Sequence, residues 1–272
     1  MTLGRNKMLI YLVDNTFDGL LTAVFDAFFR HDEPGQLLTG GDALPLFADE
    51  VHEVKTDENK AGRVWAGLEK RLRENELRMI TISWLSEDKN LNWPLFRYVC
   101  KVFHAPQDEA CRIVQNFADE DVLTVTRIAE KVAHEAHRML QFVRFQKAKD
   151  GTYLGVVSPD YNVLPLATDH FRDRFGDQPW LLYDAGRRYG FYYDTRSLHR
   201  IVFDGDENFD LRDGSLQGDM LAEDEMLFQN LWRTYFKAIC IKERINPKKQ
   251  AGDMPRRYWR YMTEMQKKPG SV

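Results

Sequence analysis

The sequence has little of what marks metalloproteins, secreted proteins or membrane-spanning proteins. Its three cysteines are scattered and odd in number, and no CxxC pair occurs, so neither a disulfide framework nor a zinc or iron–sulfur motif is evident. No stretch approaches the roughly 18 uninterrupted apolar residues of a membrane span. The amino-terminal region holds only the short apolar run MLIYLV. We therefore expect a soluble cytoplasmic protein without a signal peptide.

Signatures of several common enzyme classes are also missing. The sequence contains no Walker A loop, no GxGxxG fingerprint and no GxSxG elbow, which leaves nucleotide hydrolysis, dinucleotide chemistry and esterase chemistry without support. The stretch HEAHR holds two histidines, but the residue four positions after His134 is Arg138, where a zincin helix requires histidine. We predict that the chain has no metal site and needs no cofactor of its own.

What the sequence has in quantity is clustered charge. The net charge is −4, yet residues 241–268 carry nine Lys/Arg against three acidic side chains, a local +6. Residues 204–225 carry nine acidic side chains against Arg212 alone, a local −8. Clustered cations favour a phosphate-bearing partner whatever the total charge. The alternative is a polar tail whose arginines pair with the acidic stretch.

The hydrophobic pattern of the first half is mainly helical. A buried strand is expected at 8–13, followed by a helix opened by one of the residues 14–16, and a second short strand is possible at 51–54. Further helices are expected at about 59–74, 76–86, 93–103 and 121–144. We treat residues 1–143 as a mainly helical region with a short amino-terminal strand.

After residue 149 the sequence pattern changes to short aromatic or β-branched runs separated by Gly, Pro and Asp. Such a pattern is typical of an antiparallel sheet with tight turns. This sheet is expected at about 144–205. A strong helix follows at about 223–243, with Leu227, Phe228, Leu231, Trp232, Tyr235 and Ile239 on its inner face. The prediction is an α+β fold in which 144–272, an antiparallel sheet plus basic carboxy-terminal helices, forms one continuous globular unit with 1–143.

Long blocks of this sequence resemble a known family. The stretches YLVDNTFDGLLTAVFDAF, EAHRMLQFVRF, HFRDRF and LWRTYFKAICIKERINPKKQ, with MPRRYWRYMTEM at the end, are similar to bacterial DNA repair or DNA metabolism proteins that carry a domain of unknown function. The resemblance extends from Tyr11 to Met265. It implies association with a radical S-adenosylmethionine (SAM) protein and, in longer relatives, fusion to a uracil-DNA glycosylase domain. We expect this chain to act without a fused glycosylase.

The stretch PRRYWRYM concentrates planar cations and large rings. Arginine forks pair with phosphates, and tyrosine or tryptophan faces can stack an unpaired base, worth about 1–3 kcal/mol per base. The same segment could instead be a clasp that buries its rings on the body, or could dock a protein; rings inward and guanidiniums outward would combine two of these roles. The candidate DNA-binding residues are Arg244, Lys248, Lys249, Arg256, Arg257, Tyr258, Trp259 and Arg260, with Arg138, Arg144 and Lys147 as a second patch.

Two residues are weak candidates for acid–base catalysis. Glu135 lies in the HEAHR stretch, where an ion pair with Arg138 on the next helical turn is the simpler interpretation. His170 has an ordinary pKa near neutrality, but the sequence identifies no partner for it.

Three hypotheses follow. The first is a DNA-metabolism protein that binds damaged or single-stranded DNA and works with a radical SAM enzyme or a glycosylase. The second is an autonomous enzyme that acts on a damaged base or a DNA end. The third is an adaptor that docks an acidic protein and has no affinity for DNA.

Overall fold

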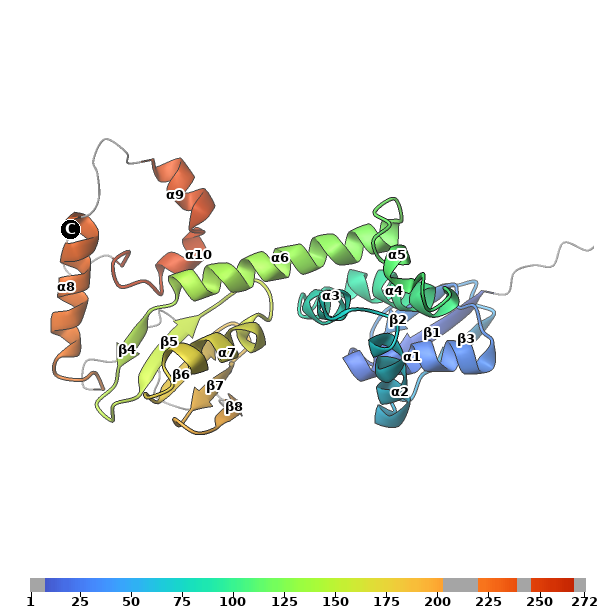
Figure 1. Cartoon of the computed structure of the whole chain (residues 1–272), viewed down its shortest axis with the longest axis horizontal. Coiled ribbons are helices and arrows are strands. Elements are labelled where there is room, and N and C mark those ends of the chain that lie inside the picture. The colour runs from blue at the N-terminus through green and yellow to red at the C-terminus, as the bar shows by residue number, and fades with distance from the viewer. Residues whose placement is uncertain (1–7, 203–219, 239–245, 267–272) are drawn as a thin grey trace, which may run out of the picture. The chain divides into compact units, whose positions relative to one another are not determined.

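The computed structural model describes residues 8–202, 220–238 and 246–266. The chain divides into two compact units, Met1–Val132 and Ala133–Val272, and the division falls inside the long helix α6, Glu120–Phe142 (Figure 1). The boundary expected from the sequence, 143/144, lies at the end of this helix. The predicted α+β class is confirmed, because both units combine helices with a sheet.

The first unit is built on a three-stranded parallel sheet of order β2-β1-β3, with β1 at Leu9–Val13, β2 at Gln36–Thr39 and β3 at Glu50–Glu53. Helix α1, Phe17–Arg30, supplies the crossover that the parallel pair β1 and β2 requires. The unit is mainly helical, as expected, and the strand considered possible at 51–54 is present as β3, but β2 was not expected from the sequence. The short run QLLT, which precedes the turn residues GGD, carries the missing strand.

Five further helices and a 3₁₀ turn complete this unit: α2 (Glu58–Glu69), α3 (Glu74–Trp84), η1 (Lys89–Leu91), α4 (Asn92–His104), α5 (Ala110–Ile113) and the first part of α6. Caps define where several helices begin. The Thr16 hydroxyl accepts the Gly19 N–H at 3.0 Å at the start of α1. The Asp119 carboxylate accepts the Val122 N–H at 3.3 Å and pairs with Lys101 Nζ at 2.6 Å. Burial opposes ionisation of Asp119, but these hydrogen bonds outweigh it and lower its pKa.

The second unit holds a five-stranded sheet of order β4-β5-β6-β7-β8: Phe145–Lys147, Tyr153–Val157, Trp180–Asp184, Tyr189–Tyr193 and Leu198–Val202. The predicted antiparallel meander is wrong at one step, because β5 and β6 pair in parallel. Helix α7, Leu164–Arg174, connects them and replaces the tight turn that the meander would need. The carboxyl ends of β5 and β6 therefore meet at one edge of the sheet.

The described residues of the second unit also form the helices α8 (Glu225–Ala238), α9 (Pro247–Asp253) and α10 (Arg256–Trp259). Its core includes Phe171 of α7 and Trp180 of β6, which are 2% and 1% exposed and make an edge-to-face ring contact. Among the described residues, no helix is long and apolar enough to cross a membrane.

Candidate nucleic-acid interface

The carboxy-terminal segment 246–266 packs its rings against the second unit. Helix α9 begins at a cap in which the Asn246 side chain accepts the Lys249 N–H at 3.0 Å, and α10 starts directly after Pro255. Tyr258, Tyr261 and Met262 are 2%, 3% and 0% exposed. The Tyr258 ring lies 5.7 Å from that of Phe142, near the end of α6. The segment thus has the buried rings expected of a clasp on the body.

Arg257 holds this clasp through a buried carboxylate. Its guanidinium pairs with Glu135, which is 2% exposed, with Nε at 3.2 Å from Oε1 and a second contact from a terminal nitrogen. The same guanidinium lies 3.1 Å from Asp160, whose N–H donates to Glu135 at 3.1 Å. Burial opposes the charge on Arg257, but the Glu135 carboxylate more than compensates and raises the pKa of the guanidinium. The ion pair predicted between Glu135 and Arg138 is replaced by this one.

The loop that presents Asp160 follows β5 and is fixed by the end of β6. Asp184, fully buried, accepts the Gly186 N–H at 2.8 Å and pairs with Arg187 at 3.0 Å. Arg187 in turn donates to the carbonyls of Pro159 and Asp160, each at 3.1 Å. Burial raises the pKa of Asp184, although its hydrogen bonds act in the opposite direction. The carboxyl edge of the parallel pair therefore supplies a rigid support for Arg257.

Two tyrosine hydroxyls near this cluster are buried without a hydrogen-bond partner among the described residues, those of Tyr258 and Tyr261. Burial is the main cause of the raised pKa of both phenols, and the Glu135 carboxylate adds to the effect at Tyr258. Because both rings are covered, neither face is open for a nucleobase. The stacking role predicted for Tyr258 has no support in this arrangement.

The second predicted patch is mostly engaged in ion pairs within the protein. Arg144 pairs with Glu264 at 2.7 Å, and the Glu264 side chain is fully buried. The Arg144 guanidinium also lies 5.5 Å from the Trp232 ring. Lys147 lies 3.5 Å from Asp224 in a more exposed pair. Arg138 is half-buried on α6, one turn after Glu135, and forms no ion pair with a described residue.

The cations that remain exposed lie along α9, α10 and the residue after α10. They make no ion pair with any described residue, and two of them cover rings of their own segment: Arg256 lies 5.7 Å from the Trp259 ring and Arg260 lies 4.6 Å from the Tyr261 ring. Trp259 is half-buried and donates its indole N–H to the Met254 carbonyl at 3.0 Å. Arg244 lies outside the described residues. The exposed set, which we call the outer cations, is Lys248, Lys249, Arg256 and Arg260.

The two candidate catalytic residues lie in different environments. Glu135 is buried and committed to Arg257, whereas His170 is exposed on α7, where its ring makes an edge contact with Phe171 at 5.4 Å. Within 8–202, 220–238 and 246–266, no group of three or more His, Cys, Asp or Glu is placed to hold a metal ion.

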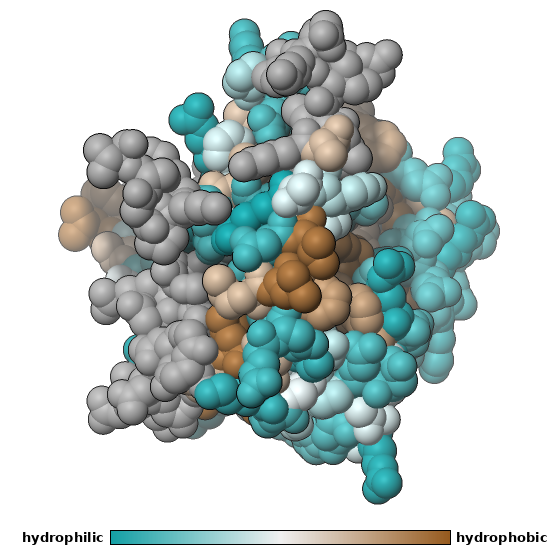
Figure 2. Space-filling model, turned by 90° about the vertical axis from the view of Figure 1, so that its left-hand side faces the viewer, coloured by the Kyte–Doolittle hydropathy of each residue, from teal (hydrophilic) through white to brown (hydrophobic). Residues whose placement is uncertain are grey.

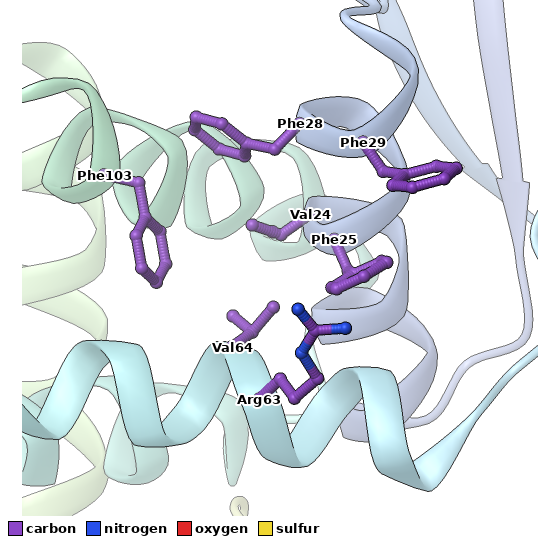
Figure 3. A pocket seen from close by; sticks show the side chains of 7 residues that line it. All are labelled: Val24, Phe25, Phe28, Phe29, Arg63, Val64 and Phe103. Carbon is purple, nitrogen blue, oxygen red and sulfur yellow. The ribbon is translucent and has the colours of Figure 1, made fainter.

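A separate apolar pocket lies in the first unit, where α1, α2 and α4 converge (Figure 3). Its volume is about 380 Å³, within the usual range of small-molecule sites. Arg63 is its one ionisable lining residue, and the guanidinium lies 4.8 Å from the Phe25 ring. The pocket offers packing and one cation but no acid or base. Its lining is Val24, Phe25, Phe28, Phe29, Arg63, Val64 and Phe103.

Sequence comparison places most of these features within one family region. A family model described as a domain of unknown function, DUF4130, matches residues 91–264. The match begins next to α4 and ends at the buried partner of Arg144, so it includes Glu135, the sheet of the second unit and Arg257. No curated protein and no solved structure matches the chain. Because the matched region covers more than half of its residues, the chain belongs to the DUF4130 family.

Proposed function

We propose that this chain is a cytoplasmic bacterial DNA-metabolism protein that binds damaged or single-stranded DNA through the outer cations. In this proposal it acts with a radical SAM enzyme or a uracil-DNA glycosylase. The observation that carries the DNA-binding part is the separation of roles within one segment. Arg257 is neutralised by Glu135 and Asp160, while the outer cations are exposed and form no ion pair with a described residue. The partner enzymes rest on the family resemblance alone.

The chemistry of this surface favours contact with phosphates over the reading of bases. Lysine and arginine side chains bind the DNA backbone without regard to sequence, and such binding weakens steeply with salt because counterions are released. Trp259 is the ring of the segment that keeps partial exposure, so it is the one candidate there for stacking on an unpaired base. The proposal therefore predicts salt-dependent binding with little sequence preference.

The test is fluorescence anisotropy of the full chain with single-stranded, duplex and abasic-site DNA at several salt concentrations. Arg256→Ala/Arg260→Ala should weaken binding and reduce the salt slope on a single strand by about 1.4, since each contact contributes roughly 0.7. The matched control is Arg174→Ala/Arg196→Ala, which removes two exposed arginines elsewhere in the same unit. If the two double variants lost the same DNA affinity, or if neither lost any, the outer cations would not be the DNA-binding surface.

The autonomous-enzyme hypothesis has less support, because Glu135 is buried and already paired with a cation. It would be restored if the purified chain alone converted a lesion substrate and Glu135→Gln abolished the turnover while the fold was retained. The adaptor hypothesis would be favoured by the absence of DNA binding even at low salt. In that case, a stable complex with the radical SAM enzyme would assign the outer cations to a protein partner.

A further inference from the structure

Helix α8 presents an apolar face to solvent. Leu227, Leu231 and Tyr235 are 60%, 55% and 55% exposed, and the neighbouring Phe228 and Trp232 are 57% and 38% exposed. The sequence pattern predicts that this face, together with Ile239, points inward. The structure shows these five residues exposed, and Ile239 lies outside the described residues. The view onto the side of the molecule that carries α8 shows apolar side chains gathered in one patch (Figure 2). Exposed patches of this kind usually mark contact surfaces.

The outward orientation of this face is fixed by polar contacts on the other side of the helix. Glu225 is buried and accepts the backbone N–H of Lys147 at 3.1 Å, and Gln229 donates to Glu225 at 3.0 Å. Arg233 donates to the Thr263 carbonyl at 2.9 Å. These three residues are spaced by four, as are Leu227, Leu231 and Tyr235. The two stripes are offset by two residues, or about 200° around the helix, so one faces the body and the other faces away.

We propose that this face pairs with the α8 face of a second copy of the chain, in an antiparallel arrangement about a two-fold axis at Leu231. The stripe is symmetric about that residue, with Leu227 four positions before it and Tyr235 four positions after it. A two-fold axis places Leu231 against its own mate and Leu227 against Tyr235 of the second copy, which is the self-complementarity that a closed dimer requires. Antiparallel packing also opposes the two helix dipoles.

The area available agrees with a reversible dimer. A side chain of this size has an accessible area of about 200 Å² when fully exposed. With the observed exposed fractions, the five side chains together expose about 500 Å² per chain, so a dimer could bury about 1,000 Å² over two copies. That total lies at the lower limit of specific protein interfaces, where association is weak and transient. None of these five residues is charged, so formation of the dimer would not bury an unpaired charge on this face.

Sedimentation velocity of the full chain over roughly 2–200 µM tests this proposal, because self-association of micromolar strength shifts from monomer to dimer across that range. Leu231→Glu should raise the dissociation constant at least about 30-fold, as expected when a central contact residue is lost. The matched control is Leu46→Glu, which makes the same change at a leucine of the first unit that is 95% exposed. This control should dimerise like the unaltered chain.

Cysteine cross-linking tests the geometry even if Leu231→Glu fails to fold. In a Cys240→Ser background, Leu231→Cys should form a disulfide-linked dimer on mild oxidation. Leu227→Cys should not, because two copies of that position lie about 12 Å apart along antiparallel helices, too far for a disulfide. An unaltered chain that stays monomeric at the highest concentration, equal dimerisation of Leu231→Glu and Leu46→Glu, or faster cross-linking at Leu227→Cys would each overturn the proposal.

Discussion

The pair between Glu135 and Arg257 makes a prediction about what anchors the carboxy-terminal segment. With Arg257 in place, Glu135 is 2% exposed, and Arg257→Ala would leave this carboxylate without its cation, although the Asp160 backbone N–H still donates to it. Removing one partner of a buried ion pair costs about 3–5 kcal/mol, because the other charge stays buried without compensation. We expect Arg257→Ala to lower the free energy of unfolding of the second unit by about 3–4 kcal/mol.

The reverse change should cost less. Glu135→Gln would leave Arg257 with its side chain 29% exposed and still 3.1 Å from Asp160, so water and the second carboxylate partly replace the lost partner. We expect a loss of about 1.5–2 kcal/mol, the lower part of the range for a hydrogen bond to a charged group. The double variant should lose less unfolding free energy than the sum of the two single variants. In the double variant, Glu135→Gln has already removed the buried charge that Arg257→Ala alone would leave without a partner.

The assay is hydrogen exchange followed by mass spectrometry, because it reports the stability of β5 and β6 separately from that of the first unit. The matched control is Lys147→Ala, which breaks an ion pair in the same unit whose two side chains are 36% and 47% exposed. Exposed pairs contribute at most about 1 kcal/mol. If Arg257→Ala destabilises the second unit no more than Lys147→Ala does, the argument that Arg257 is an anchor fails.

Three further results are expected. Tyr258→Phe and Tyr261→Phe should change the unfolding free energy by less than about 0.5 kcal/mol or increase it, because each removes a buried hydroxyl without a partner; denaturant titration checks this. Gly190→Ala should cost about 1–3 kcal/mol in the same titration, since its Cβ would lie 2.5 Å from the Leu182 carbonyl oxygen and neither backbone can move freely. The lowered pKa of Asp119 means that its contribution to stability is present above about pH 4 and is lost as pH falls below that value, so an acid titration of the first unit should show Asp119→Asn to be less acid-sensitive than the unaltered chain.

Local signals were enough to predict much of the fold. The apolar stripe and the Asp14–Thr16 opening predict α1, which begins after the Thr16 cap and ends at Arg30. The 3.6-residue pattern likewise predicts α6 at nearly its observed bounds. Both elements depend on interactions within a few residues, which a single sequence displays directly.

Pairings between distant residues could not be predicted in this way. The pattern of 153–193 is compatible with a meander, and only recognition of α7 as a helix reveals that β6 must run parallel to β5. At α8 the periodicity identifies an apolar face correctly but carries no information about which side meets the body. The partner of Glu135 is 122 residues away, whereas helical spacing can suggest only nearby partners such as Arg138.

For the same reason, the number of basic residues in the carboxy-terminal segment is larger than the number that are free to bind phosphate. Arg256 and Arg257 are adjacent and chemically identical, yet one is exposed and the other is neutralised by carboxylates far away in the sequence. Residues 246–266 contain five Lys/Arg. Arg257 is already paired with carboxylates, so the four outer cations remain available to contact phosphate. At roughly 0.7 per phosphate contact, these four account for a single-strand salt slope of about 3 at most. A measured slope well above that value would require cations outside this segment to contact DNA, and Arg138 would be the first to replace because it forms no ion pair with a described residue.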